Sequence, residues 1–439
     1  MKTSSTVARE LAAPPPPPPT QRIFYGWIVL GLAFTVLFFA YGIQFTFGVF
    51  MPAIEADTGW DRASLSLPYA LYVFLYSALG AASGWATDRW GPRIVILSGG
   101  CLLGGGILLT SQVQELWQLY VSLGLIAAMG MSAAFVPCNS TVVRWFIRRR
   151  GLALSISTSG GSMGNFLFPP LAAALIGAYG WRSAYLILGG VGLAVIGLCA
   201  VFIVRDPQQL NLQPDGAPPA PAQEESHRHA VSGAGYTLAE ARGTLSFWLL
   251  NLVFTLTWLV VFMPFIHLVP LAIDLGVPQV GAATVMSVMG LGSLGGRLLS
   301  GAISDRLGRL PTLGVSLALQ VLAFVGFMLS SDLRLLYPSA LIFGLAYGGA
   351  ATLFPAIVGD FFGLISVGAI VGFIFAVAGS TAAFGPYIAG YLYDASGSYQ
   401  TAFLLGAGLN LLGLGVLFFV RKPPTKGVVS APAAFAYGR

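Results

Sequence analysis

One arginine lies inside an otherwise uncharged, apolar stretch of this sequence. Arg297 is the only charged residue between positions 280 and 304, and the charged pair Asp305 and Arg306 follows it. If the stretch is a membrane helix, the rise of 1.5 Å per residue places Arg297 about 12 Å from its charged end, inside the hydrocarbon. An unpaired charge at that depth costs at least about 2.5 to 3.5 kcal/mol, so Arg297 is predicted to mark the path of an ion or a substrate.

The apolar runs of the sequence offer no counter-ion for Arg297. They contain no Asp, Glu or Lys away from their ends, where the carboxylates are Asp88, Asp305, Asp360 and Asp394. A buried ion pair and snorkelling of the arginine towards the headgroups are the structural alternatives. We expect the missing anion to be the substrate, because arginine binds a carboxylate through two parallel N–H···O bonds and a single cation suits a monoanion.

Small residues share a helical face with Arg297. Spacings of three, four and seven residues along a helix select Gly290, Ser293, Ser300 and Gly301. These small and hydroxyl-bearing side chains leave room beside the guanidinium. Ser293 is therefore a second candidate for substrate binding.

The surrounding chain has the composition of a membrane protein. Of its 439 residues 56% are hydrophobic and only 9% are charged, whereas a soluble domain carries about a quarter charged residues. Helices are predicted over its apolar runs, because a backbone in lipid must satisfy its own hydrogen bonds and a helix of about 20 residues crosses the hydrocarbon core. The twelve runs are 23–54, 63–87, 94–114, 116–143, 151–181, 183–204, 243–273, 275–304, 310–331, 335–359, 361–393 and 395–420.

The predicted fold is an all-α membrane protein with twelve transmembrane helices in two pseudo-symmetric six-helix bundles. A shift of 217 residues places Asp57 on Asp274 and the segment 84–93 on 301–310. Duplicated six-helix halves are typical of secondary transporters, whose substrate site lies between the halves near the bilayer midplane. The predicted division is a Pro-rich tail (1–23), an N-terminal bundle (24–204), a linker (205–244), a C-terminal bundle (245–421) and a second tail (422–439).

Basic residues predict the orientation of the helices. With twelve spans, 18 of the 22 Lys and Arg residues fall on the side of both termini, and only Arg62, Arg182 and Arg334 fall on the other. Both termini are therefore predicted to be cytoplasmic. The net charge of +6 is explained by these cytoplasmic basic residues, which would lie next to anionic lipid headgroups. No nucleic acid partner is therefore expected.

The residue types argue against enzyme chemistry. The apolar runs contain no cluster of nucleophile, base and metal ligands, so no catalytic residue, metal site or cofactor is predicted. The three cysteines are far apart in sequence and form no CxxC pair, which favours a packing role.

Two copies of a loop motif resemble the major facilitator superfamily. The pattern G-x-x-x-D-R/K-x-G-R/K follows the second helix, with its last basic residue one position later at Arg93, and it also follows the eighth helix. In that family these loops latch the halves on the cytoplasmic face and release as the carrier rocks. The resemblance assigns this latch to Gly84, Asp88, Arg89, Gly301, Asp305 and Arg306.

Further segments resemble the branch that contains monocarboxylate transporters and oxalate/formate exchangers. These segments are "YGW" from Tyr25, "RWFIRRRGLALSISTSGGSMG" from Arg144 and "FGPYIAGYLYDASGSYQTAF" from Phe384. The branch holds the substrate carboxylate with an arginine in this part of helix 8, and the resemblance adds Tyr347 and Tyr120 as hydroxyl donors to the substrate. Phe375 is a further candidate, which would pack against the apolar side of the substrate. This sequence departs from the branch at two places. It has Ser293 where proton-coupled members have a carboxylate, and it lacks the lysine that the oxalate exchangers have in helix 11.

We therefore expect a monomeric, multi-pass transporter of the cell membrane. Its predicted substrate is a small monocarboxylate such as lactate, pyruvate or formate, moved by alternating access together with a proton or in exchange for a counter-anion. A carrier for another small organic anion, an anion channel and a signalling receptor on the same scaffold are the alternatives. Other candidates to line the cavity are Asn165, Trp258, Tyr69, Tyr72 and Tyr76. His267 is expected to be an interfacial or hydrogen-bonded histidine rather than a proton relay.

Overall fold

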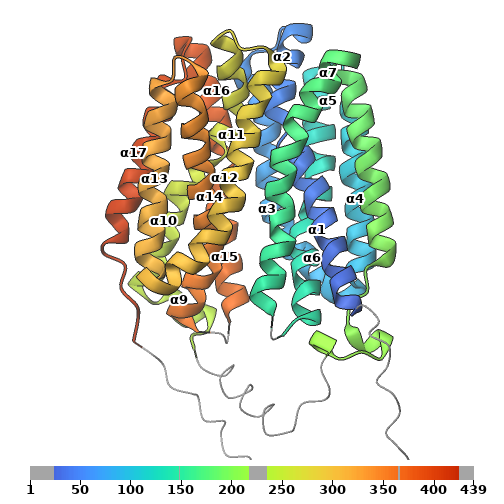
Figure 1. Ribbon diagram of the computed structural model, residues 1–439, viewed down its shortest axis with the longest axis vertical. Coiled ribbons are helices and arrows are strands. Elements are labelled where there is room, and N and C mark those ends of the chain that lie inside the picture. Colours follow the sequence, from blue (N-terminus) through green and yellow to red (C-terminus); the bar gives the residue numbers. More distant parts are fainter. Residues whose placement is uncertain (1–23, 148, 217–234, 364–365, 425–439) are drawn as a thin grey trace, which may run out of the picture.

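The computed structural model describes residues 24–147, 149–216, 235–363 and 366–424. Within these ranges the chain is helical and forms no strand, which confirms the predicted all-α class. The predicted tail 1–23 and residues 425–439 of the second tail lie outside the described residues. Figure 1 shows two bundles side by side, one coloured blue to green and the other yellow to red.

The first bundle and the segment after it contain α1 (Tyr25–Gln44), α2 (Phe47–Thr58), α3 (Arg62–Trp90), α4 (Pro92–Thr110), α5 (Leu116–Leu119), η1 (Tyr120–Ala127), α6 (Ala128–Trp145), α7 (Arg150–Phe202), η2 (Pro207–Leu210) and η3 (Pro214–Gly216). The second contains α9 (Leu238–Arg242), α10 (Leu245–Val261), α11 (Met263–Asp274), α12 (Gln279–Leu307), α13 (Arg309–Leu329), α14 (Leu333–Phe362), α15 (Val367–Thr381), α16 (Phe384–Ser396) and α17 (Gln400–Leu417).

Eleven helical segments of the described chain are long and apolar enough to cross a membrane. One of them, α7, has 53 residues and is interrupted at Gly180, where φ is 79° and ψ is 161°. A straight helix of that length would measure about 80 Å, far more than the roughly 30 Å of the hydrocarbon core. The break lies at the end of the predicted run 151–181, one residue before its last. Counting the two parts of α7 separately supports twelve spans. The number of spans and the side of the termini stay predictions.

The internal repeat has a counterpart in the backbone. Gly91 and Gly308, which are 217 residues apart, have nearly identical conformations, with φ 84° and ψ 158° in the first and φ 88° and ψ 155° in the second. Gly59 and Gly276 form a second such pair, with φ of 72° and 83°. Positive φ is readily adopted only by glycine, which explains why the residue type recurs at both turns.

The two bundles contact each other through α7 and α12, α3 and α16, and α2 and α11. At the end where α2 ends and α3 begins, here called the Arg62 end, an ion-pair cluster joins them. Arg62 donates from Nη1 and Nη2 to the two carboxylate oxygens of Asp274, at 2.7 and 2.8 Å. Its Nε lies 3.2 Å from Glu55, and Nη1 also donates to the hydroxyl of Tyr399 at 2.8 Å. We call Arg62, Glu55, Asp274 and Tyr399 the Arg62 cluster.

The opposite end, which carries the two loop motifs, has no ion pair between the bundles among the described residues. Arg144 pairs with Asp88 at 3.0 Å inside the N-terminal bundle. Arg309 pairs with Asp360 at 2.9 Å inside the C-terminal bundle. Within the described residues, ion pairs therefore join the bundles at the Arg62 end and not at the motif end.

The remaining residues of the predicted latch lie apart from the other bundle's charges. Arg89 lies over the ring of Trp85, 5.5 Å from its centroid, whereas Asp305 and Arg306 are exposed and form no ion pair within the described chain. Gly84 permits the expected close helix approach, since a Cβ there would lie 3.2 Å from Val136. Gly301 does not, because open space surrounds it.

Part of the predicted linker packs on the C-terminal bundle. Residues 217–234 lie outside the described residues, but Tyr236 is buried, and its N–H and hydroxyl donate to the carbonyls of Phe362 and Pro424 at 2.7 and 2.6 Å. Thr237 and Glu240 then form a capping box that starts α9. An aromatic side chain and a helix cap thus order a segment whose composition is polar.

Candidate functional site

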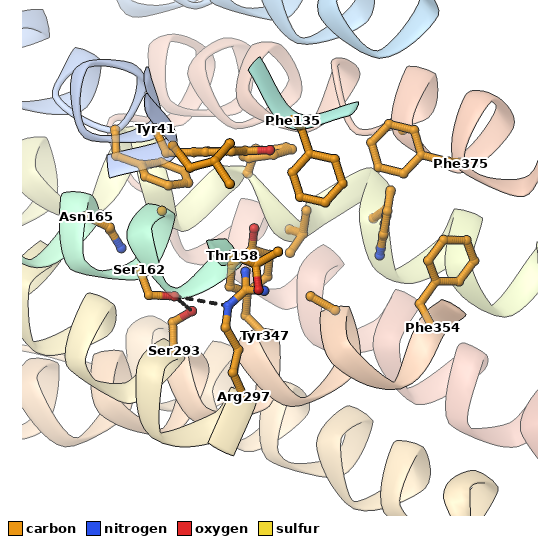
Figure 2. A pocket seen from close by; sticks show the side chains of 18 of the residues that line it. Tyr41, Phe135, Thr158, Ser162, Asn165, Ser293, Arg297, Tyr347, Phe354 and Phe375 are labelled. Atoms are coloured by element: carbon orange, nitrogen blue, oxygen red, sulfur yellow. Dashed lines mark hydrogen bonds between the residues drawn. The ribbon is translucent and has the colours of Figure 1, made fainter. Parts of the chain in front are cut away.

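A cavity of about 210 Å³ lies between the two bundles, and Figure 2 shows it from close by. Its walls come from α1, α3, α6 and α7 of the first bundle and from α10, α12, α14 and α15 of the second. The side chains that define its chemistry are Tyr41, Phe45, Tyr76, Phe135, Thr158, Ser162, Asn165, Trp258, Ser293, Arg297, Tyr347, Phe354 and Phe375.

Arg297 is the only charged residue among the described residues that line this cavity. Its Nε donates to the hydroxyl of Ser162 at 3.0 Å, and Ser162 in turn lies 3.0 Å from the hydroxyl of Ser293. No carboxylate of the described chain forms an ion pair with Arg297, so an internal ion pair does not explain it. Snorkelling does not explain it either, because the guanidinium faces the cavity (Figure 2).

Glycines of α12 set the position of Arg297. A Cβ on Gly290 would lie 2.6 Å from the backbone nitrogen of Phe166, so glycine lets α12 touch α7 of the other bundle. Gly292 and Gly296 lie against the backbone of α14, where a Cβ would collide with the carbonyl oxygens of Leu341 and Leu345. Such small residues allow the close helix packing that is common in membranes. This packing brings α7, α12 and α14 together around the guanidinium.

Two phenols lie near the guanidinium of Arg297. Tyr347, from α14, lies beside the guanidinium in Figure 2. Tyr41, from α1, is also close enough to interact electrostatically with Arg297. Neither hydroxyl has a hydrogen-bond partner within the described part of the chain, and both residues line the cavity. Phenol O–H groups are donors, so both are available to a bound anion.

The structure gathers four of the five predicted binding residues. Arg297, Ser293, Tyr347 and Phe375 line the cavity, as do the secondary candidates Asn165, Trp258 and Tyr76. Tyr69 and Tyr72 are instead buried in the packing, with ring centroids 5.7 Å apart. His267 has the predicted hydrogen-bonded role, because Nδ1 lies 3.1 Å from the Tyr399 hydroxyl and Nε2 lies 2.8 Å from the Pro386 carbonyl.

Tyr120 does not line the cavity. It begins η1 at the Arg62 end and its electrostatic neighbours are Tyr387 and Asp61, the N-cap of α3. The structure does not bring Tyr120 together with Arg297, and its role as a substrate contact stays a prediction. Tyr120 lies too near the end of its span, whereas the cavity is lined from that span by Phe135, a residue of α6 farther along the chain.

Sequence reasoning missed two polar groups of the site. Ser162 lies in the segment "SISTSGGSMG", and nothing in that segment distinguishes Ser162 from the neighbouring serines. Tyr41 is one aromatic residue in an aromatic helix. Only the packing of α1 on α7, and of α7 on α12, places these two residues at the cavity.

The fold and the site define a membrane transporter rather than an enzyme. The chain belongs to the Major Facilitator Superfamily, whose profile matches residues 33–380 and 330–435.

Among curated proteins it is similar to monocarboxylate transporters. It is 29% identical to human monocarboxylate transporter 11 over 89% of this chain and 81% of that protein. It is 25% identical to rat monocarboxylate transporter 12 over 87% and 82%, and 28% identical to bovine monocarboxylate transporter 13 over 91% and 92%.

Two solved structures share the fold. They are inward-facing structures of a bacterial homologue of the human lysosomal transporter Spinster, one unoccupied and one occupied. Their TM-scores are 0.66 and 0.68, both at 16% identity, and they cover 91% of this chain and 95% and 97% of theirs. The likeness supports the architecture alone.

Proposed function

We propose that this protein carries monocarboxylate anions across the membrane by alternating access, with Arg297 binding the carboxylate. The observation that carries the proposal is a guanidinium that has no acidic partner among the described residues and lies in a cavity between two duplicated bundles. The similarity to monocarboxylate transporters supports the same substrate class.

The contacts of Arg297 leave one edge of its guanidinium free for substrate. Nε is bonded to Ser162, and the two terminal nitrogens have no hydrogen bond within the described residues. These two N–H groups point in parallel and match the two oxygens of a carboxylate. The hydroxyls of Tyr347 and Tyr41 can complete the shell around the anion.

The charge of the site supplies a reason for coupling binding to movement. Closing both bundles over an unpaired guanidinium removes it from water, which is costly. A bound monocarboxylate neutralises it and lowers that cost, so the loaded carrier changes sides more readily than the empty one. Exchange of one anion for another is then faster than net transport.

The composition of the cavity favours anion exchange over proton symport. Its described lining contains no Asp, Glu or His that would take up a proton together with the anion. Lactate, pyruvate and formate are the simplest members of the proposed class. Formate tests the lower size limit, since it has no apolar body.

Counterflow in proteoliposomes tests the proposal. Vesicles are loaded with an unlabelled monocarboxylate and the entry of a labelled one is followed, with and without a pH gradient. We expect saturable uptake that is stimulated by substrate on the opposite side. Flux that rises linearly with concentration would indicate a channel, and the absence of exchange for every monocarboxylate would overturn the proposal.

A further inference from the structure

The two ends of the cavity differ in chemistry. Figure 2 shows Asn165, Ser162, Ser293 and Arg297 together on one side, and Phe135, Phe375 and Phe354 on the other. The site is therefore a polar end joined to an aromatic one. A lactate-sized anion bound at Arg297 would occupy only the first.

The aromatic end is built from both bundles. Trp258 holds the wall of the C-terminal bundle together, with ring centroids 5.2 Å from Phe375 and 5.7 Å from Phe354, both in edge-on contacts. On the N-terminal side the rings of Tyr41 and Phe135 meet edge-on at 6.4 Å. These rings also face the cavity, so they leave an aromatic slot between the bundles.

The volume of the cavity exceeds what a three-carbon acid fills. An apolar cavity of about 150 Å³ is enough to hold a benzene molecule. The cavity here measures about 210 Å³, which leaves space for a ring and a short chain that ends in a carboxylate. Filling the aromatic end with water instead would be unfavourable, because water there finds few polar partners.

The polar end of the cavity has one further polar atom without a hydrogen-bond partner among the described residues. Asn165 is 1% exposed and lines the cavity, yet its Oδ1 has no donor among the described residues. Turning the amide group directs Oδ1 into the cavity, where a hydroxyl next to the carboxylate of a substrate is a suitable donor. A hydroxyl on the substrate's second carbon would thus suit the same end as the carboxylate.

We propose that the preferred substrates are monocarboxylates with an aromatic or similarly bulky apolar body, and that 2-hydroxy acids of this kind fit best. This inference rests on the proposed function and assigns its substrate class. The carboxylate binds Arg297, and the ring lies between Phe135 of the first bundle and Phe375 of the second. Because that ring touches both bundles, its binding also favours closure of the cavity around it.

The pair lactate and 3-phenyllactate tests this inference, since the two acids share one polar head and differ by a phenyl group. Counterflow is measured for each with the purified full-length protein in proteoliposomes. We expect 3-phenyllactate to half-saturate at a concentration at least tenfold lower, which corresponds to about 1.4 kcal/mol. The uncharged amide of 3-phenyllactate should not exchange.

The outcomes separate this inference from the proposed function. Exchange of lactate with equal or better affinity than 3-phenyllactate overturns the inference and leaves the monocarboxylate carrier standing. Exchange of neither acid, nor of any other monocarboxylate, overturns both.

A change of the wall gives a second, independent measurement. Ala351 lines the cavity one helical turn after Tyr347, so Ala351→Phe places a ring where the substrate's ring would lie. We expect the preference for 3-phenyllactate over lactate to fall at least tenfold. Leu335→Phe, at an exposed position of the same helix, is the matched control and should keep the preference. An unchanged preference in folded Ala351→Phe protein would contradict the assignment.

Discussion

Arg297 on α12 donates from Nε to the hydroxyl of Ser162 on α7 across 3.0 Å. The two residues belong to different bundles, so the cation proposed to bind substrate is positioned by the opposite half of the molecule. Ser162 and Ser293 are both at most 3% exposed, which makes this hydrogen bond part of a closed contact between the bundles. Movement of one bundle relative to the other must therefore change the orientation of the guanidinium.

Ser162→Ala is predicted to weaken substrate binding. A hydrogen bond to a charged group contributes about 1.5 to 3 kcal/mol, and its loss also frees the guanidinium to rotate. We expect the half-saturating concentration in counterflow to rise about tenfold. Ser159→Ala is the control, because the Ser159 hydroxyl only bonds the carbonyl of Ile156 in its own helix. Equal kinetics in the two variants would remove Ser162 from the site.

Arg297→Lys is predicted to lose most transport although it keeps the positive charge. Lysine has a single ammonium group and lacks the parallel N–H groups that match a carboxylate. We expect exchange to fall by at least about tenfold. Arg334→Lys, at an exposed position of α14, should behave as the wild type. Uptake by Arg297→Lys at the wild-type rate would count against the role of the guanidinium.

Arg62→Gln is predicted to open the Arg62 end. The side chain is 7% exposed and neutralises two carboxylates, so its loss leaves Glu55 and Asp274 unpaired and repelling each other. Removing one partner of a buried pair costs about 3 to 5 kcal/mol. Asp274→Asn should have a weaker effect, because Glu55 still balances Arg62.

Spin labels measure this opening. They are attached to Ala56→Cys and Ala395→Cys, exposed positions on α2 and α16, after the three native cysteines are replaced by alanine. Arg62→Gln should add a longer distance to the distribution. Arg182→Gln is the control, since Arg182 pairs with Asp57 inside the N-terminal bundle. An unaltered distribution in Arg62→Gln would show that the cluster does not hold the bundles together.

Asp305→Asn is predicted to destabilise the conformation in which the Arg62 end is open and the motif end is closed. Asp305 has no ion pair within the described chain in the present structure, so its neutralisation should not disturb this state. If the motif loops latch the bundles when the Arg62 end is open, the variant loses that state and exchanges more slowly. Labels on Ile94→Cys and Leu307→Cys should then show fewer short distances, and normal exchange would exclude a latch at Asp305.

The architecture was largely predictable from the distribution of charge. Charges end the helices and apolar runs fill them, so the spans follow from the sequence wherever a run has the length of a bilayer. The repeat was predictable as well, because Gly91 and Gly308 are required by their positive φ. The unpaired state of Arg297 followed from the absence of acids in the runs.

Contacts between the bundles were not predictable, because they depend on how separate helices rotate against each other. The two copies of one aspartate illustrate this. Asp57 pairs with Arg182 inside its own bundle, whereas the position equivalent to Arg182 in the second bundle is Tyr399, which brings no positive charge to Asp274. Asp274 is therefore available to Arg62 of the other bundle. A shift of 217 residues aligns the carboxylates but does not show which partner each one takes.

The single positive charge of the cavity has an electrical consequence. A bound monoanion makes the site neutral, because the described lining contains no other charged residue. Under the proposed alternating access the empty site keeps its charge, so its return moves that charge through the membrane field, which is worth about 2.3 kcal/mol per elementary charge for each 100 mV. Voltage thus acts on the unloaded step and hardly on the loaded one. A negative potential inside the cell therefore favours the inward-facing empty carrier under this proposal. Binding of an anion then neutralises the site.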